Sequence, residues 1–148
     1  MVIIAVPSFG NGGLNENFNS RFGRCDSFTF VTIEKKEIVE VKSVPNPAMD
    51  AMGSAGIQAA QTVGSNGADE VIVGFVGPNA ASSLNALKLK MYQAPNKSMT
   101  VKEVVELYLK GDLEVITAAN ASSHYGMGGG RGMGGGGGMG GGRRRGVQ

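Results

Sequence analysis

Residues 71–80 read VIVGFVGPNA, which joins a candidate buried strand directly to the start of a candidate helix. Val71–Val76 is a short apolar run, and such runs are typical of strands that are buried on both faces of a sheet. Pro78 suits the first position of a helix, because its missing N–H would have no partner there. We expect Leu84 and Leu87 of this helix to face the core. A strand followed at once by a helix predicts an α/β domain.

The segments on either side extend the same alternation. The hairpin is expected because two β-rich runs are joined by four charged residues, 34–37. Thr100-x-x-Glu103 is a capping box that starts the last helix, and Gly111 is suited to end it. The other expected elements are strands over 2–6, 28–33, 38–44 and 90–94 and a helix over 55–63. Because strand–helix alternation implies parallel pairing and the hairpin implies antiparallel pairing, we predict a mixed five-stranded sheet.

The C-terminal segment 126–148 has a different composition from the rest of the chain. It contains 14 of the 25 glycines, no acidic residue and four arginines. Residues 1–125 hold 10 basic and 12 acidic residues, a net charge of −2, whereas this arm carries +4. Glycine loses the most conformational freedom on ordering, so we expect a disordered cationic arm that binds an anionic partner. The four arginines are Arg131, Arg143, Arg144 and Arg145.

Several classes of protein are disfavoured by what the sequence lacks. It has no H-E-x-x-H or C-x-x-C motif, no paired carboxylates and no histidine near Cys25, so an enzyme is not expected. No apolar run approaches the roughly 18 residues of a membrane span. Cys25 is the one cysteine, which excludes an internal disulfide and fits a reducing cytoplasm. We therefore expect a cytoplasmic binding protein.

The candidate binding loop is Arg21-Phe22-Gly23-Arg24-Cys25. The spacing of Arg21 and Arg24 could set two guanidinium groups over one anion, although an ion pair within the fold is an equal alternative. Arg24 is expected to lower the pKa of Cys25, which would make the thiolate a candidate iron ligand. One thiolate cannot hold a four-cysteine cluster, so this role would need a second chain, a small thiol or sulfide already bound to the iron. A partly buried, unused thiol is an equal alternative.

Other candidate ligand residues carry weaker signals. The glycine-rich loop 8–13 could offer backbone N–H groups to an anion, but it matches no nucleotide-binding motif. Met49 and Met52 are soft donors that could suit Cu(I), although core packing is the favoured explanation. His124 stands alone among small polar residues, as expected of a linker.

Four parts of the chain together resemble the dinitrogenase iron–molybdenum cofactor biosynthesis family of small NifX/NifB-type domains. These parts are the 20–25 segment SRFGRC with Phe28, the 53–60 stretch, the turn GFVGPNA at 74–80 and the ending EVVELYLKGDL at 103–113. The resemblance implies a ribonuclease-H-like, three-layer α/β fold that binds or carries iron–sulfur and iron–molybdenum clusters. This chain has Arg21 where many family members have a histidine, which leaves charge attraction in place of direct ligation.

The arm narrows the expected function. A domain of this type with a glycine-rich cationic arm resembles archaeal iron–sulfur storage proteins, which implies that the arm templates anionic, thioferrate-like iron sulfide. We expect a cluster-binding domain over 1–118, a linker over 119–125 and self-association that multiplies weak contacts of the arms. The alternatives are a carrier of discrete Fe–S or molybdenum-containing clusters and a polyanion-binding protein. RNA is not the expected partner, because no aromatic residue follows Tyr125 to stack on bases.

Overall fold

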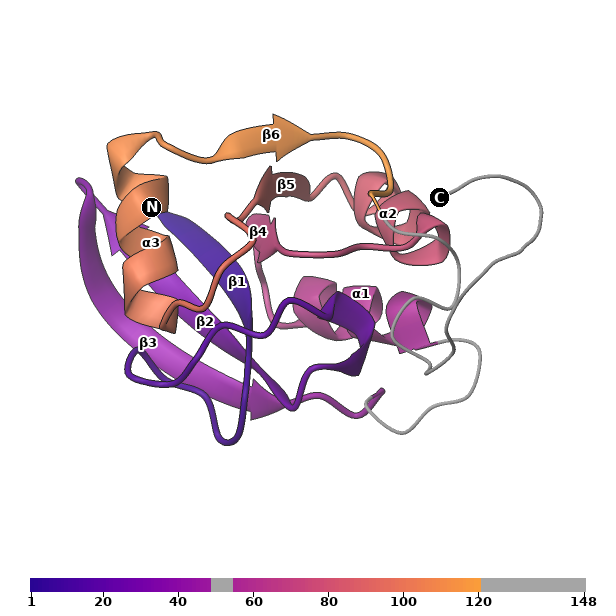
Figure 1. Ribbon diagram of the computed structural model, residues 1–148, viewed down its shortest axis with the longest axis horizontal. Helices are drawn as coiled ribbons and strands as arrows, with labels where there is room; N and C mark the ends of the chain where they lie inside the picture. The colour runs from indigo at the N-terminus through magenta and orange to yellow at the C-terminus, as the bar shows by residue number, and fades with distance from the viewer. Residues whose placement is uncertain (49–54, 121–148) are drawn as a thin grey trace.

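A mixed six-stranded sheet forms the middle of the molecule (Figure 1). The computed structural model describes residues 1–48 and 55–120. The strands are β1 (Val2–Ser8), β2 (Ser27–Glu34), β3 (Glu37–Pro45), β4 (Glu70–Val73), β5 (Lys90–Gln93) and β6 (Glu114–Ile116). Their order across the sheet is β3-β2-β1-β4-β5-β6. β1, β4 and β5 are parallel, while β2, β3 and β6 pair antiparallel with their neighbours, so the sheet is mixed as expected.

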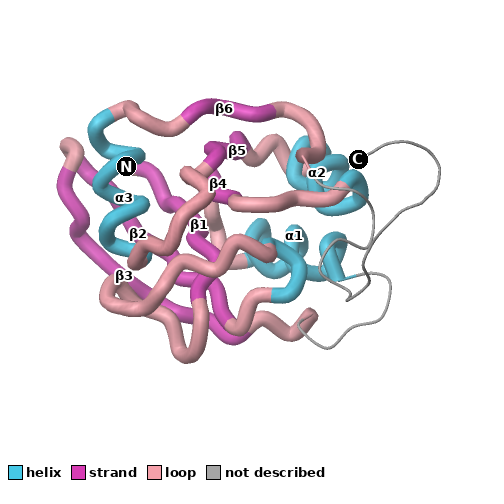
Figure 2. Tube along the Cα trace, viewed as in Figure 1, coloured by secondary structure: helices cyan, strands magenta, loops and turns pink. Residues whose placement is uncertain are grey.

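Helices cover both faces of the sheet and give three layers. α1 (Ala55–Ser65) and α2 (Pro78–Ala86) share one core with alternate residues of the strands, such as Ala5 and Val73. α3 (Val101–Lys110) packs on the other face, where the intervening strand residues, such as Ile4 and Ile72, form a second core. Figure 2 shows α1 and α2 near each other and well separated from α3. The three layers follow from the period of two in the strands, which sends alternate side chains to opposite faces.

The predicted five strands are one too few. The sixth strand, β6, pairs antiparallel with β5. It is only three residues long and just one of them, Ile116, is half-buried, so no strand pattern marks it in the sequence. β4 also ends earlier than expected, at Val73, and Leu87 is 46% exposed, whereas Leu84 is buried as predicted.

The signals at the ends of α3 are confirmed. The hydroxyl of Thr100 accepts a hydrogen bond from the N–H of Glu103, and the Glu103 carboxylate accepts one from the N–H of Thr100. Gly111 ends the helix in the left-handed conformation, with φ 77°. Both ends of α3 are thus set by the residues that form them.

Some predicted features lie outside the described residues. These are the cationic arm with Arg131, Arg143, Arg144 and Arg145, most of the expected linker with His124, and the pair Met49 and Met52. Within 1–48 and 55–120, no helix has the length and apolar character needed to cross a membrane.

The turn between β2 and β3 stores backbone strain. It consists of Lys35 and Lys36, which have φ values of 55° and 64°. Such two-residue hairpin turns favour Asn-Gly, because a side chain with a Cβ is strained at positive φ. Replacing Lys35→Asn together with Lys36→Gly should therefore raise the free energy of unfolding by about 1 kcal/mol.

Chemical denaturation of the two proteins would measure this gain. Lys97→Gly is the matched control, since Lys97 is an exposed lysine outside the positive-φ residues and its replacement should give no gain. Equal or lower stability of the double variant would show that the turn is not strained.

Candidate functional site

The predicted binding loop lies where the parallel strands β1 and β4 end. Phe22–Arg24 forms a single turn of 3-10 helix, η1, in which the N–H of Arg24 donates to the carbonyl of Arg21. The loop is tied to the chain leaving β4, because the N–H of Phe75 donates to Ser20 O at 2.7 Å and Arg21 forms a bridge with Phe75. The carboxyl ends of parallel strands are a usual place for binding sites in α/β sheets.

Three glycines allow the segments of the site to touch at backbone level. A Cβ on Gly74 would lie 2.6 Å from the Cβ of Ser20, which is closer than two non-bonded carbon atoms can approach. A Cβ on Gly23 would lie 3.2 Å from the N of Gly56, and one on Gly56 would lie 3.0 Å from the Cβ of Ala80. The binding loop therefore rests against the start of α1, and the start of α1 rests against α2.

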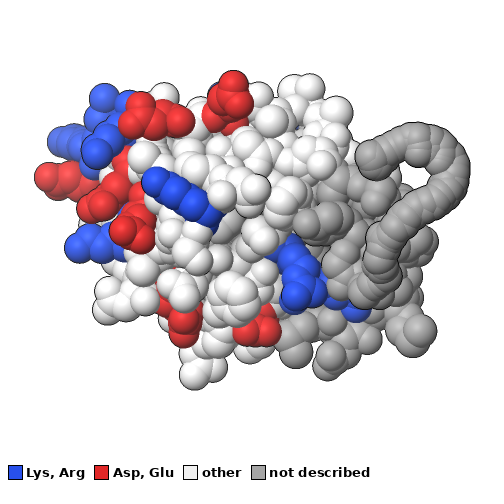
Figure 3. Space-filling view, viewed as in Figure 1, with Lys and Arg blue, Asp and Glu red and all other residues white. Residues whose placement is uncertain are grey.

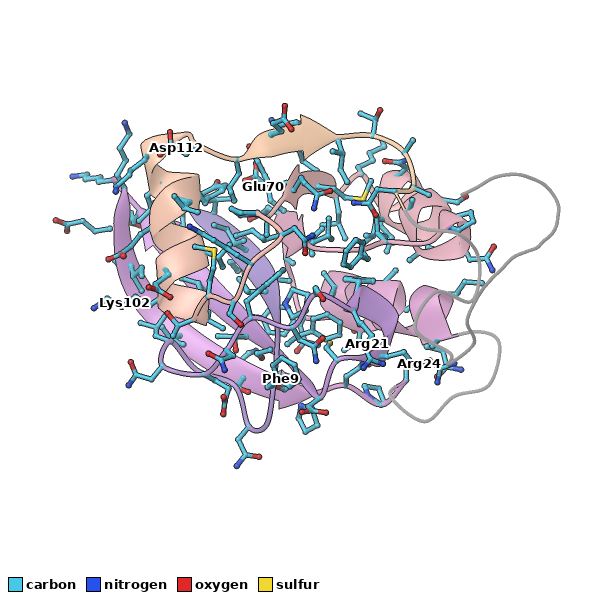
Figure 4. All side chains as sticks on the ribbon, viewed as in Figure 1. Phe9, Arg21, Arg24, Glu70, Lys102 and Asp112 are labelled. Carbon is cyan, nitrogen blue, oxygen red and sulfur yellow. The ribbon has the colours of Figure 1, made fainter. Side chains whose placement is uncertain are left out.

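The site is positively charged by both side chains and backbone. Among the described residues, the first turns of α1 and α2 contain no acidic side chain that would offset the partial positive charge expected at a helix start. Arg21 is exposed and Arg24 is half-buried beside these helix starts. Figure 4 shows both arginines away from α3, close to the start of α1. This corner of the molecule is suited to hold an anion.

The rest of the charged surface has a different character. Figure 3 shows basic and acidic side chains mixed at the end of the molecule that carries α3, while a separate basic group lies toward the opposite end, where Figure 4 places Arg21. Mixed charges largely cancel beyond a Debye length, about 8 Å at physiological ionic strength. Attraction of an anion is therefore expected to be strongest at the Arg21–Arg24 corner.

Cys25 does not behave as predicted from its neighbour. The residue is fully buried, and its thiol donates to the carbonyl of Phe22 at 3.4 Å. Burial raises the pKa of Cys25 to about 12, so the expected lowering of this pKa by Arg24 is wrong. Desolvation is the main cause, because a buried thiolate loses its hydration, and it outweighs the hydrogen bonds from Asn46 and the backbone that lower this pKa. Within the described ranges, no group of three His, Cys, Asp or Glu side chains could hold a metal ion.

The glycine N–H groups of the loop 8–13 are hydrogen-bonded within the fold. The N–H of Gly10 donates to the Asp26 carboxylate at 2.8 Å, and that of Gly13 donates to the Thr29 hydroxyl at 2.9 Å. The N–H of Gly12 donates to Phe9 O. The three N–H groups that could have bound an anion are thus used within the fold.

The chain beyond β6 returns to the site, which the sequence does not indicate. The side chain of Asn120 accepts a hydrogen bond from Val76 N at 2.7 Å and donates to Gly74 O at 2.8 Å. Gln93 donates to the same Gly74 carbonyl and is also hydrogen-bonded to Asn120. Asn120, the last residue that the structure describes, is thus held directly beside Gly74–Val76.

A pocket of about 310 Å³ adjoins the binding loop. Ser20, Gly74 and Phe75 form the side that it shares with the loop. Phe9, which Figure 4 labels, and Lys97 also line it, so the pocket offers an aromatic wall and one positive charge. This pocket was not expected from the sequence, and the available signal was an aromatic residue shortly after each of two parallel strands, Phe9 after β1 and Phe75 two residues after the end of β4.

A family model described as dinitrogenase iron–molybdenum cofactor matches residues 1–111. The chain belongs to this family. A protein of Methanocaldococcus jannaschii is 33% identical over 100 residues, which cover 68% of this chain and 83% of that protein. The family match ends at residue 111, before the arm, so the domain is the part of the chain that is shared with the family.

Two solved structures are similar to the domain. The apo form of the orange protein from Desulfovibrio gigas has a TM-score of 0.74 and 32% identity, covering 82% of this chain and 98% of that chain. A NifB-type protein from Thermotoga has a TM-score of 0.68 and 30% identity, with the same coverage of both chains. Nearly the whole of each of these proteins therefore corresponds to the domain alone.

The buried thiol leads to a test of reactivity. With a pKa of about 12, the thiolate fraction of Cys25 at pH 8 is about 10⁻⁴. In the native protein, alkylation by iodoacetamide at pH 8 should therefore be at least about 1000-fold slower than in denaturant. Mass spectrometry of the alkylated protein measures both rates.

The same pKa predicts a loss of stability in alkali. The unfolded thiol ionises near pH 9, whereas the folded thiol stays neutral up to about pH 12. The contribution of Cys25 to the free energy of unfolding is therefore fully present below pH 9 and declines as the pH rises from about 9 to about 12. Cys25→Ala is the control, because it should remove this part of the pH dependence. In the alkylation test described above, rapid reaction in native buffer would show instead that the thiol is accessible.

Proposed function

We propose that this protein binds preformed anionic iron–sulfur clusters by charge and hydrogen bonding, and that it is not an enzyme. The observation that carries this proposal is the positive corner formed by Arg21, Arg24 and the starts of α1 and α2. Its donors are guanidinium and backbone N–H groups, which suit the sulfide surface of an anionic cluster. Membership of the iron–molybdenum cofactor family supports a cluster as the ligand, and a molybdenum-containing cluster is equally suited.

The residues at the corner fit a cluster that arrives already assembled. Arginine has a permanent charge and no lone pair to give to iron, so it attracts a cluster without replacing its ligands. Cys25 could ligate iron only after leaving the core and losing its proton, and both changes are unfavourable. The proposed cluster therefore keeps its own sulfide or thiol ligands.

Storage of iron sulfide is our first candidate for the biological use of this binding. The arm carries four arginines and no acidic residue, and the described chain ends at Asn120 beside the positive corner. A thioferrate-like polymer is a long anion that could run from the corner along the arm. Many weak arginine contacts would then retain it, as in other multivalent binding.

Carriage of a discrete cluster is the second candidate. It is favoured by the family match, which ends at residue 111 and so requires no arm. The pocket of about 310 Å³ beside the corner would accommodate a small cluster or its ligands. We also propose a ribonuclease-H-like fold for the domain, which the strand order of the sheet fits. A carrier would use this fold only as a rigid support for the site.

Two sets of variants distinguish the contribution of the corner to iron binding from that of the arm. Arg21→Gln with Arg24→Gln removes both charges of the corner, and Arg131, Arg143, Arg144 and Arg145 →Gln remove those of the arm. Lys102→Gln with Lys110→Gln is the matched control, because α3 lies on the other face of the sheet. The measurement is the number of irons and sulfides retained per chain after anaerobic addition of ferrous iron and sulfide, followed by gel filtration.

For storage, we expect many irons per chain in the intact protein and a loss of most of them in the arm variant. For carriage, we expect a few irons per chain, unchanged in the arm variant, and cluster affinity at least about tenfold lower in the corner variant. Thermal melting confirms that each variant is folded. Iron binding that is unchanged in both variants would contradict the proposal, and salt-sensitive RNA binding without iron uptake would favour the polyanion alternative.

A further inference from the structure

The outer edge of β3 pairs with no other strand in the described part of the chain. β3 has nine residues, and only Ile38 and Val44 among them are half-buried, while the rest are exposed. Val39 is 55% exposed and Val41 is 38% exposed. A long edge strand with exposed valines presents a row of backbone donors and acceptors that another strand could use.

The register with β2 places the charges of β3 on one face. Lys42 lies opposite Phe30 and Glu40 lies opposite Thr32, whereas Val41 lies opposite Val31. Phe30 and Val31 belong to different cores, so Glu40 and Lys42 share one face and Val41 lies on the other. The Lys42 ammonium lies 5.9 Å from the centre of the Phe30 ring, which holds this side chain near the sheet.

From this pattern we infer that two copies of the chain pair through β3, antiparallel, with Val41 of each copy at the two-fold axis. In this register Glu40 of one copy lies opposite Lys42 of the other, and this pair occurs twice. Val41 lies opposite Val41 on the other face. The centre of β3 is also Val41, so the strands overlap along their whole length.

The charges exclude the two neighbouring symmetric registers. Centring the pair on Glu40 would place two carboxylates opposite each other, and centring it on Lys42 would do the same with two ammonium groups. Like charges directly opposite each other on a sheet are destabilising, while opposite charges are stabilising. Residues that lie opposite each other must also point to the same face of the sheet. A two-fold axis between two consecutive residues would pair residues of opposite faces, so these registers are not available.

The edge is irregular at one end, which limits the strength of the dimer. The register between β2 and β3 shifts at Thr32/Ile33, near Val39, so the regular part of the edge begins at Glu40. The pairing therefore depends mainly on the three residues 40–42 of each copy and their immediate neighbours. We expect a reversible dimer with a small interface, in which the two Glu40–Lys42 pairs choose the register.

Charge reversal on the full chain tests this register. Glu40→Lys would place lysine opposite Lys42, and Lys42→Glu would place glutamate opposite Glu40, so each single variant should weaken the dimer at least about tenfold. The double variant, Glu40→Lys with Lys42→Glu, restores opposite charges and should restore the dimer. Sedimentation equilibrium gives the dissociation constants, and thermal melting should be similar for all variants because both residues are exposed.

Cysteine cross-linking tests the axis independently. Val41→Cys should form an intermolecular disulfide on mild oxidation, because its two copies face each other. Val39→Cys is the control and should not, because Val39 faces Ser43 of the other copy. Cys25 is buried and does not compete. A monomer at all concentrations, association that is unaffected by the single charge reversals, or cross-linking through position 39 rather than 41 would overturn the inference.

Discussion

Ser20 and Gly74 lie so close together that a single added methyl group would not fit between them. This contact joins the long connection between β1 and β2 to the chain that leaves β4, and the hydrogen bond from Phe75 N to Ser20 O continues it. The position of η1 follows from this junction, and with it the positions of Arg21 and Arg24. Because Gly23 and Gly56 allow the next two close approaches, the positive corner is built on backbone contacts together with the buried side chain of Phe22.

The proposed site would hold an anion by electrostatic attraction and hydrogen bonding, and this chemistry differs from that of a ligated cluster site. Ligation would require a deprotonated donor, and the one thiol of the chain is held neutral by burial. Charge attraction is weaker and depends on ionic strength, but it allows a cluster to enter and leave without breaking iron–ligand bonds. Both storage and carriage need such release, so the buried cysteine is consistent with either use.

Sequence reasoning was most successful where structure is local. The capping box of α3 and the hairpin depend on residues within a few positions of one another and appear as expected, and the strand before Pro78 is present but ends earlier, at Val73. β6 was missed because its three residues are held by pairing with β5 rather than by their own pattern. The Asn120 contacts were missed because they join residues 46 and 44 positions apart, and the raised pKa of Cys25 because burial is a property of the whole fold.

The order of the strands relates the binding corner to the edge of the sheet. β3 is at one end of the sheet, and the carboxyl ends of β1 and β4 lie toward its middle, so pairing through β3 leaves the corner open. The two-fold axis of an antiparallel strand pair is perpendicular to the sheet, so it keeps α1 and α2 of both copies on one face but reverses the direction of every strand. The two corners lie at the carboxyl ends of β1 and β4, so in the inferred dimer they point in opposite directions along the strands of the widened sheet. Such a dimer could hold two separate anions and link them, which a storage assembly requires and a carrier of single clusters does not.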